Sequence, residues 1–559
     1  MKKGILTKAL SVFLLIVCIS SVFTSCKKSD ANEESGKLST DISSYKIVRV
    51  DAASGKLPTM TSNFKKAILE HTKAELEVTT DYVKRGEELD ESGSEILIGD
   101  TNRTVSINAL AELDEKGYEG GFIIKAEGNK IAIVGTSDDQ TVIALKYFIN
   151  NYVMKSAKEN TLPIQSGDTV IEETGKILHM TADFNAIVLE KLTTVFDPGT
   201  IKSQIWETYA KVIKLEHSGE HNGTLLATHE QRPNNSSDHL FRYPIFRSTD
   251  DGDTWEQIAL VNDTYNKNPT VGYQPYLFEL PEDIGSFKKG TILLGGCTRT
   301  NNQSQTIMVL YYSTDVGKNW KTWGNIDVGG AYHSDQYTSN GLWEPVFMYE
   351  ESTKRLYCFY SDEMDPGHSQ RLVYKYTTDM KTWSKKYEAV ACENKMLRPG
   401  MVALTKMGDK YALAFELGGI RTEGGYPIYV KIADSLDDWG DISDYGQLVA
   451  APGDKIMGSG PAIAWTPLGG ECGTLMVTAH GMLSGYTKTK CDLFLSFDYG
   501  KTFIAIDNPI PNMPNEHTGS GYSPGFYVDS DGSVYYVNDP EVAPNSLCEK
   551  LMFAKIKIY

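Results

Sequence analysis

Short apolar runs alternate with polar turns through the second half of the chain. Runs such as Ile307–Tyr312 and Leu372–Tyr376 have the length and composition typical of β-strands. Each run leads directly into a polar turn that contains Asp, and a second extended run follows. This order predicts a series of antiparallel hairpins.

The turns share the pattern Ser-x-Asp-x-Gly-x-(Thr/Asn)-(Trp/Phe). Glycine tolerates a positive φ, the Ser and Asp side chains can bond the backbone of the turn, and the aromatic residue anchors the hairpin. The copies start 65, 64, 58 and 61 residues apart, and a fixed period of this size indicates stacked supersecondary units. Three copies are complete and two are degenerate: Ser248–Trp255, Ser313–Trp320, Ser496–Phe503, Thr377–Trp383 and Ser435–Trp439.

The period predicts a six-bladed β-propeller over residues 176–559, with roughly 64 residues per blade. Five turns are visible. We expect the sixth blade to form when the region after Phe503 pairs with the first strand after about residue 176. Such closure protects the strand edges of the ring.

The turn motif is missing from residues 43–155, which predict a small α+β domain. We expect strands at Ile47–Val50 and Glu95–Gly99, and a helix at Asn63–Leu76. Gly121–Ala126 and Lys130–Gly135 predict a hairpin. A second helix is expected at Asp139–Tyr152, with Ser137 or Asp138 as its N-cap, and residues 156–175 are interpreted as a polar linker.

The first 25 residues predict a signal peptide. Lys2, Lys3 and Lys8 precede the apolar run Ala9–Val22, which is too short to span a membrane. Phe23-Thr24-Ser25-Cys26 resembles a bacterial lipobox, and the alternative is an ordinary signal peptide with a chance cysteine. The lipobox interpretation predicts an exported lipoprotein that is anchored at Cys26, with a tether over residues 26–42 and no other membrane contact.

Composition narrows the possible partners. The chain has 559 residues, 41% of them hydrophobic, and a net charge of −18; this charge argues against nucleic acid, which requires clustered Lys and Arg. No His, Cys or Asp cluster has the spacing of metal ligands, so we expect neither a metal nor a cofactor. Six cysteines remain after Cys26, and their pairing stays open: Cys297, Cys358, Cys392, Cys472, Cys491 and Cys548.

Two glutamates occur where the inner strands of a propeller would converge on its channel. Glu344 lies beside Trp343 at the start of an apolar strand, and Glu416 ends the apolar run Lys410–Glu416. A buried acid is costly unless it is paired or used. Each could therefore be catalytic, or could form a structural ion pair or an exposed strand end.

Seven segments between about residues 205 and 530 match a known family: Gly223–Thr228, Tyr273–Tyr276, Trp343–Pro345, Tyr357–Glu363, His368–Val373, Arg398–Met401 and Tyr411–Glu416. They resemble glycoside hydrolase family 93, the exo-α-1,5-L-arabinanases, which are six-bladed propellers related to sialidases. In the same way the repeated turn resembles the Asp-box of sialidase-like propellers.

The resemblance implies that two glutamates cleave the glycosidic bond with retention of configuration, and the matching positions are Glu344 and Glu416. Retaining cleavage needs one ionised carboxylate and one protonated carboxyl group. We assign Glu416 as nucleophile and Glu344 as acid/base, although the reverse order stays open. Trp343 could stack on a sugar or pack within a blade. Further candidates for substrate binding are His229, Glu230, Arg232, Asp362, His368, Arg398 and Tyr522.

The function implied is release of arabinobiose from linear α-1,5-arabinan, a polysaccharide or oligosaccharide substrate. A sialidase would need three arginines to grip a carboxylate, and the expected first strand, Tyr209–Ile213, has none. A non-catalytic glycan-binding propeller and another exo-glycosidase of this fold stay open. The first domain resembles the non-catalytic domain that precedes the catalytic domain in several bacterial glycosidases.

Overall fold

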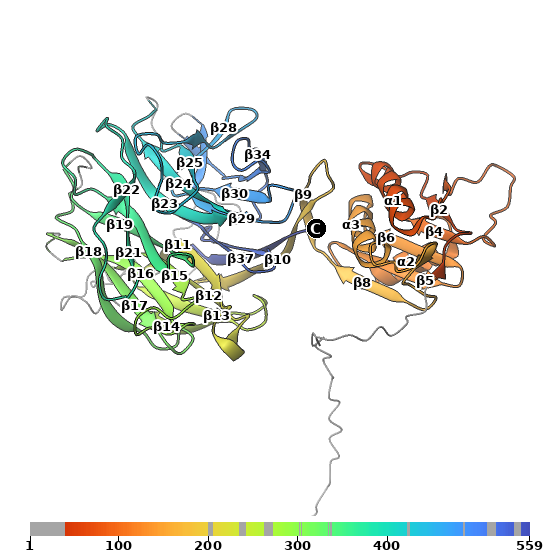
Figure 1. Ribbon diagram of the computed structural model, residues 1–559, viewed down its shortest axis with the longest axis horizontal. Helices are drawn as coiled ribbons and strands as arrows, with labels where there is room; N and C mark the ends of the chain where they lie inside the picture. The colour runs from red at the N-terminus through yellow and green to blue at the C-terminus, as the bar shows by residue number, and fades with distance from the viewer. Residues whose placement is uncertain are drawn as a thin grey trace, which may run out of the picture.

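The computed structural model has two lobes, a small one from the N-terminal part of the chain and a large one from the rest (Figure 1). The predicted signal peptide and Cys26 lie outside the described residues. None of the described helices is long and apolar enough to cross a membrane. The structure describes residues 40–199, 205–233, 242–261, 272–300, 302, 304–333, 335, 338–421, 425–484, 487–510, 521–541 and 549–559.

The small lobe is a six-stranded sheet with helices on both faces. The sheet order is β3-β2-β4-β6-β5-β8; the first four strands run parallel, and β5 pairs antiparallel with both of its neighbours, β6 and β8. Its strands are β2 (Lys46–Arg49), β3 (Val78–Thr80), β4 (Glu95–Ile98), β5 (Gly121–Glu127), β6 (Lys130–Gly135) and β8 (Thr169–Glu173). A two-stranded sheet of β1 (Thr40–Asp41) and β7 (Thr161–Leu162) lies beside it, so the end of the predicted tether is a strand.

Alternate residues of the central strands face the two helical layers. Ile47 packs in one core with α1 (Leu57–Thr72) and α3 (Asp138–Phe148), whereas Val48 packs in a second core with α2 (Thr104–Asp114). This alternation is the period of two that places successive strand residues on opposite faces.

The small lobe agrees with the predicted α+β domain, with three differences. Helix α1 begins at Leu57, earlier than expected, and α2 was not predicted, because its apolar stripe of Val105, Ala109 and Leu113 is narrow and short. Residues 156–175, interpreted as a linker, contain β7 and β8, and β8 completes the sheet by pairing with β5. Ser137 is the N-cap of α3, and its hydroxyl accepts a bond from the Gln140 N–H at 3.2 Å.

The large lobe is a six-bladed propeller, as predicted. Blade 1 contains β11 (Ile205–Lys214), β12 (Leu225–Pro233), β13 (Tyr243–Ser248) and β14 (Glu256–Val261). Blade 2 contains β15 (Gly272–Glu279), β16 (Ile292–Arg299), β17 (Thr306–Ser313) and β18 (Lys321–Val328). Blade 3 contains β19 (Leu342–Glu350), β20 (Arg355–Asp362), β21 (Arg371–Thr377) and β22 (Tyr387–Val390).

The other three blades are more varied. Blade 4 contains β23 (Arg398–Met407), β24 (Lys410–Gly418), β25 (Ile428–Ala433) and β26 (Gln447–Leu448). Blade 5 contains β29 (Ala462–Thr466), β30 (Thr474–Thr478), β33 (Leu493–Ser496) and β34 (Ile504–Ile506), beside a small sheet of β27 (Ala450–Ala451), β28 (Lys455–Gly458), β31 (Gly481–Ser484) and β32 (Thr487–Thr489). Blade 6 contains β35 (Gly525–Val528), β36 (Val534–Asn538) and β37 (Leu551–Ile558), followed by β10 (Ala186–Phe196) and β9 (Lys176–Met180).

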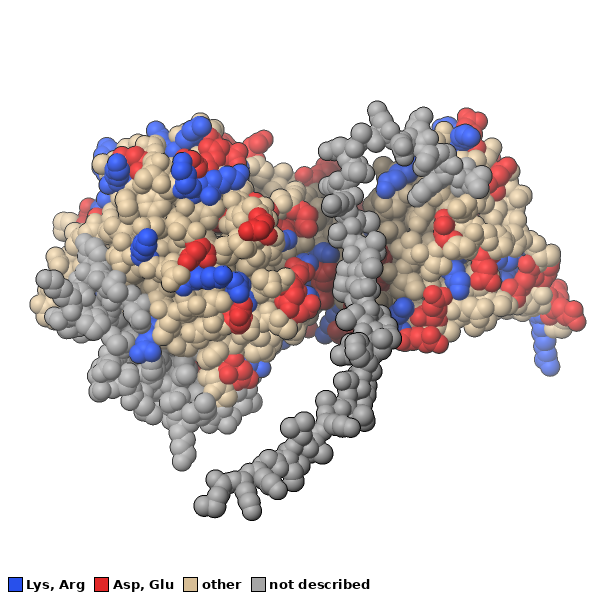
Figure 2. Space-filling view, turned by 90° about the horizontal axis from the view of Figure 1, so that it is seen from below, with Lys and Arg blue, Asp and Glu red and all other residues tan. Residues whose placement is uncertain are grey.

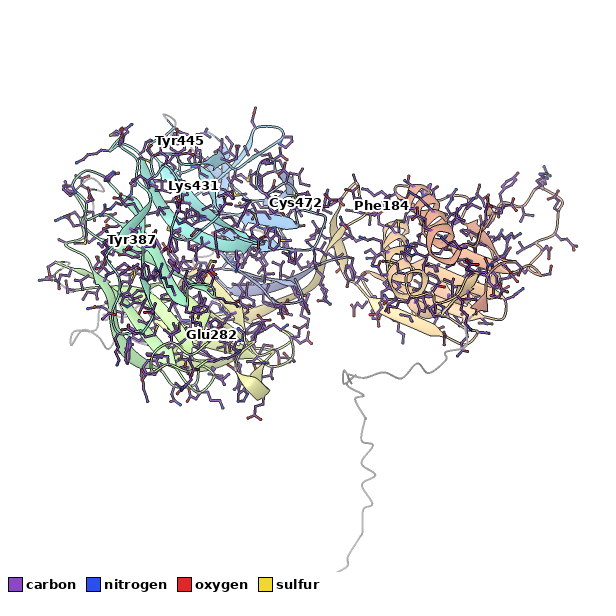
Figure 3. All side chains as sticks on the ribbon, in the orientation of Figure 1. Phe184, Glu282, Tyr387, Lys431, Tyr445 and Cys472 are labelled. Carbon is purple, nitrogen blue, oxygen red and sulfur yellow. The ribbon has the colours of Figure 1, made fainter. Side chains whose placement is uncertain are left out.

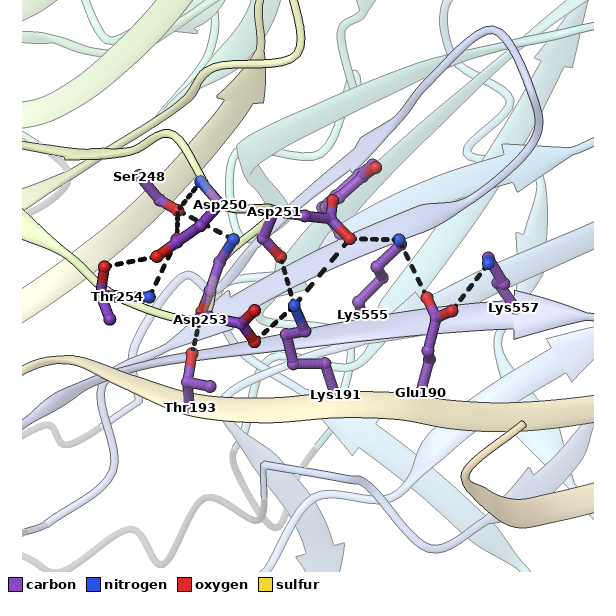
Figure 4. A network of polar contacts seen from close by, with 12 residues as sticks. Glu190, Lys191, Thr193, Ser248, Asp250, Asp251, Asp253, Thr254, Lys555 and Lys557 are labelled. Atoms are coloured by element: carbon purple, nitrogen blue, oxygen red, sulfur yellow. Dashed lines mark hydrogen bonds and ion pairs between the residues drawn. The ribbon is translucent and has the colours of Figure 1, made fainter. Parts of the chain in front are cut away.

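Blade 6 closes the ring with strands from both ends of the propeller. Strand β10 precedes blade 1 in the sequence and pairs antiparallel with β37 near the C-terminus, so the predicted closure is confirmed. Ion pairs tie the turn of blade 1 to these two strands (Figure 4). Lys191 lies 2.6 Å from Asp253, and Lys555 bridges Glu190, at 2.9 Å, and Asp251, at 2.5 Å.

The repeated turns have the hydrogen bonds that their sequence predicts. The Ser248 hydroxyl donates to Asp250 at 2.7 Å and accepts from the Gly252 N–H at 2.8 Å, while Asp250 accepts from the Thr254 N–H at 3.0 Å. The turns at Ser313 and Ser496 repeat these bonds. The turn motif therefore shapes the outer hairpin of a blade.

The two lobes share one hydrophobic core. Met180, Ala186 and Val188 of the propeller pack in the same cluster as Phe64 and Phe148 of the small lobe. Phe184 lies at this junction (Figure 3). On the face drawn in Figure 2, acidic and basic side chains are interspersed over both lobes.

Candidate active site

The inner strands of the first four blades share a bulge, where the pairing with the second strand shifts. The bulge residues Tyr209, Gln274, Glu344 and Met401 have φ between 57° and 65°, a conformation that stores strain and that clusters at functional sites. Ser459 and Ser523 have the same conformation just before the inner strands of blades 5 and 6. Glu344 is therefore one member of a ring at one level of the channel.

Neighbouring members of the ring hold the Glu344 carboxylate. Gln274 donates from its amide to Oε1 at 3.3 Å and accepts the Glu344 N–H at 3.1 Å. The Ser361 hydroxyl donates to Oε2 at 2.6 Å, and the Met401 N–H donates to the same oxygen at 3.2 Å. These contacts fix the position of the carboxyl group before any substrate binds.

Burial raises the pKa of Glu344 to about 7, and repulsion by Glu416 adds to this effect. The bonds from Ser361 and Met401, and the charge of Arg398, act in the opposite direction. A carboxyl group with such a pKa can hold a proton near neutral pH and donate it, as a general acid must.

Glu416 lies near the end of β24, opposite Gly400, and its Oε2 accepts the N–H of Gly460, just before β29, at 2.9 Å. The charge of Glu416 acts on Glu344 and on Tyr522. The structure therefore brings together the two glutamates that the sequence analysis selected.

Arg398 and Tyr522 lie beside this pair, since the charge of Arg398 acts on Glu344 and that of Glu416 acts on Tyr522. Arg398 donates to the Ser369 carbonyl at 3.1 Å and forms an ion pair with the buried Glu363. The ring of Tyr522 lies edge-on to Tyr209, with centroids 5.6 Å apart.

Glu230 also lies at the channel, in the place of blade 1 that corresponds to Glu416 in blade 4. Each lies on the second strand, opposite the residue that precedes the bulge. Its Oε2 accepts the Gln274 N–H at 2.9 Å. Glu230 thus supports the bulge that positions Glu344.

Two of the predicted binding residues are buried away from any substrate. Asp362 is fully buried and accepts bonds from Arg371 at 2.9 and 3.1 Å, so it forms a structural ion pair. His229 is fully buried too, lies 3.2 Å from Asp539, and packs edge-on against Phe196 and Phe246. Because both side chains are fully buried, the structure does not support the prediction that they contact the substrate.

The remaining candidates are His368 and Trp343, which are partly exposed, and Arg232. His368 is half-buried on the loop after β20, 3.2 Å from Asp365. Trp343 is partly exposed and lies edge-on to Tyr273 and Tyr332. The side chain of Arg232 lies outside the described part of the chain.

Sequence reasoning did not single out Gln274 and Ser361, which contact the Glu344 carboxylate directly. Neither residue type is diagnostic of catalysis, and their signal is positional. Gln274 occupies the bulge one blade before Glu344, and Ser361 lies opposite the residue before that bulge. Knowing the register of the strands would have identified both.

Metal ligands and disulfides do not appear among the described residues. In that part of the chain, no group of three His, Cys, Asp or Glu side chains could hold a metal ion. The five cysteines described there are free thiols, and Cys548 lies outside the description.

Comparison with known proteins gives two close structural matches. The GH93 alpha-L-arabinofuranosidase of Fusarium graminearum, solved with arabinobiose, is 26% identical and has a TM-score of 0.55, covering 66% of this chain and 97% of its own. The alpha-L-arabinanase of Penicillium chrysogenum, also solved with arabinobiose, is 29% identical with a TM-score of 0.53, covering 65% of this chain and 97% of its own. These matches confirm the resemblance to family 93.

The chain is a glycoside hydrolase. No family model and no curated protein sequence matches it. The hydrolase is similar to its structural relatives over about two thirds of its length, which is the share that the propeller occupies. The small lobe is additional to those relatives.

Proposed function

We propose that this hydrolase releases arabinobiose from the ends of linear α-1,5-L-arabinan, with retention of configuration. The observation that supports this most is the pairing of Glu344, whose pKa burial raises to about 7, with Glu416 one blade away. Both structural relatives were solved with arabinobiose.

In the first step, the Glu416 carboxylate attacks the anomeric carbon as the bond to the leaving oxygen breaks. The protonated Glu344 carboxyl group donates its proton to that oxygen, so the shortened chain leaves as a neutral alcohol. The Gly460 N–H donates to Oε2 of Glu416 and orients this carboxylate before attack.

In the second step, the Glu344 carboxylate takes a proton from water, and the water oxygen attacks the anomeric carbon. The bond to Glu416 breaks, and its carboxylate is restored. Two displacements at one carbon retain the configuration, and Glu344 regains its proton for the next cycle.

The first test is a time course with linear α-1,5-arabinan and the protein without residues 1–26. We expect arabinobiose as the early product. A mixed ladder of oligosaccharides would contradict exo action. If no product forms, linear α-1,5-arabinan is not the substrate. Sialyl-lactose serves as the control for the sialidase alternative, and we expect no cleavage of it.

A second test assigns the two glutamates. Glu344→Ala and Glu416→Ala should each lose at least about 10³-fold in kcat on an arabinan substrate. Added azide distinguishes the roles. With the acid/base removed, azide should give a glycosyl azide of retained configuration, and with the nucleophile removed, one of inverted configuration. The opposite pattern would exchange the two roles.

We also propose, from the sequence of residues 1–26 alone, that the chain is exported and lipidated at Cys26. Expression in a bacterium with labelled palmitate should label the wild type, whereas Cys26→Ala should stay unlabelled. Equal labelling of both would contradict this proposal.

A further inference from the structure

Arg299 ends the second strand of blade 2, at the channel end that holds the two glutamates. Cys297, two residues earlier, lies opposite the residue before the bulge, as Ser361 and Glu416 do in the next two blades. The thiol of Cys297 is close enough to Glu344 for that carboxylate to help raise its pKa. Arg299 therefore occupies the next layer outward, about 7 Å further along the strand.

The same layer of blade 3 contains Glu363, two residues after Ser361. Glu363 forms the ion pair with Arg398 beside the catalytic pair. Arg299 and Glu363 thus occupy equivalent positions in successive blades, a cation in blade 2 and an anion in blade 3. We call this outer layer of the channel its mouth. Arg299 belongs to the wall of the mouth by this register.

Two tyrosine rings hold the Arg299 guanidinium. Its central carbon lies 4.6 Å from the ring centre of Tyr273 and 4.7 Å from that of Tyr332. Trp343 lies edge-on to both rings, at 6.4 and 5.7 Å between centroids. Aromatic faces attract a guanidinium and restrict its rotation, so the side chain is fixed before any ligand arrives.

The other arginines beside this mouth pair with carboxylates. Arg371 contacts Asp362, Asp365 and Glu388, and Arg398 contacts Glu363. Among the described residues, Arg299 instead contacts the two rings and the Tyr273 hydroxyl, and no Asp or Glu pairs with it. It is partly exposed, so its remaining N–H groups can reach a ligand.

We propose that Arg299 recognises a vicinal pair of hydroxyls on the sugar unit one position away from the unit that Glu416 attacks. A guanidinium presents donors in a planar fork, which fits two adjacent hydroxyl oxygens. The ligand is a neutral sugar rather than an anion because the proposed substrate is an arabinan. This inference therefore rests on the proposed function. The Arg299 site would then select a disaccharide product over a single sugar.

The test compares two chromogenic substrates, p-nitrophenyl α-L-arabinofuranoside and p-nitrophenyl α-1,5-L-arabinobioside. Arg299→Met removes the donors and keeps an unbranched side chain. We expect kcat/KM on the bioside to fall about 10- to 100-fold, the range for losing hydrogen bonds to a charged donor. On the single-sugar substrate we expect a change of less than about twofold.

Arg355→Met is the matched control. Arg355 also stacks on a tyrosine, with its central carbon 4.2 Å from the ring centre of Tyr376, and it pairs with Asp437 at 2.7 Å. It begins β20, whereas Asp362 near the mouth ends that strand, so it lies far from the site. The control should leave the ratio of the two substrates unchanged.

Equal loss on both substrates in Arg299→Met would assign Arg299 a general structural role and overturn the inference. No loss on either would overturn it as well. Bioside analogues that lack one hydroxyl on the distal sugar refine the test, since wild type should lose rate on them and Arg299→Met should not lose more. If wild type cleaves neither substrate, the proposed function fails, and the inference fails with it.

Discussion

The Ser361 hydroxyl holds the pKa of Glu344 lower than burial alone would, so replacing it should move the pH dependence of the enzyme. In the proposed mechanism Glu344 is the acid and must be protonated, so kcat/KM should fall as the pH rises through about 7. Ser361 donates to Oε2 at 2.6 Å and thereby stabilises the carboxylate form. In Ser361→Ala the pKa of Glu344 rises further, and the alkaline limb of the profile moves to higher pH.

The size of the shift follows from the strength of one bond. A hydrogen bond to a charged group contributes about 1.5–3 kcal/mol, and one pH unit corresponds to about 1.4 kcal/mol, which gives a shift of about 1 to 2 units. The Met401 N–H still donates to the same oxygen at 3.2 Å, so we expect the lower end, about 1 unit.

The assay is kcat/KM on the p-nitrophenyl arabinobioside from pH 4 to pH 10, since this ratio reports the free enzyme. Ser313→Ala is the matched control, because Ser313 is equally buried but belongs to the turn of blade 2. In the control, the alkaline limb of the kcat/KM profile should stay at its wild-type pH. A limb that stays in place or moves to lower pH in Ser361→Ala would refute the assignment of Glu344 as the acid.

Three further changes test the positioning of Glu344 and the packing of the propeller. Gln274→Ala should lower kcat about 10-fold or more and leave KM within a few-fold, because the Glu344 Oε1 atom loses its bond from Gln274 and the carboxyl group is positioned less firmly; steady-state kinetics would contradict this if only KM changed. Gly252→Ala should lower the free energy of unfolding by about 1–3 kcal/mol, because φ is 89° and the new Cβ would lie 2.4 Å from the ring of Phe553; an unchanged denaturant midpoint would argue against the ring closure at this turn. Arg371→Met should cost about 3 kcal/mol of stability, because Asp362 stays buried without its closest cation, whereas Lys288→Met at an exposed pair should cost less than about 1 kcal/mol; equal costs would show that the buried pair has no special role.

Much of the fold could be predicted because the turn motif is local. Ser248, Asp250 and Gly252 bond within a single turn, so a few neighbouring residues determine the conformation, and the spacing of the copies gives the number of blades. The position of Glu344 and Glu416 near one another follows from the same period, aided by the family resemblance.

The burial of Asp362 and His229 could not be predicted, because it depends on how the strands pair and pack. Arg371 pairs with Asp362 across a hairpin, and His229 contacts Asp539, which lies 310 residues further along the chain. Neither contact has a local pattern. The bulge at Glu344 has no sequence pattern either, since the four bulge residues Tyr209, Gln274, Glu344 and Met401 differ in side-chain type.

The central claim is that two glutamates release arabinobiose with retention, and methanolysis tests it most directly. Linear α-1,5-arabinan is digested in water that contains methanol, and the methyl glycosides are identified by NMR at early times. The account predicts methyl α-L-arabinobioside, formed when methanol replaces water in the second displacement. Methyl β-L-arabinobioside, or a single-sugar methyl glycoside as the first product, would contradict it.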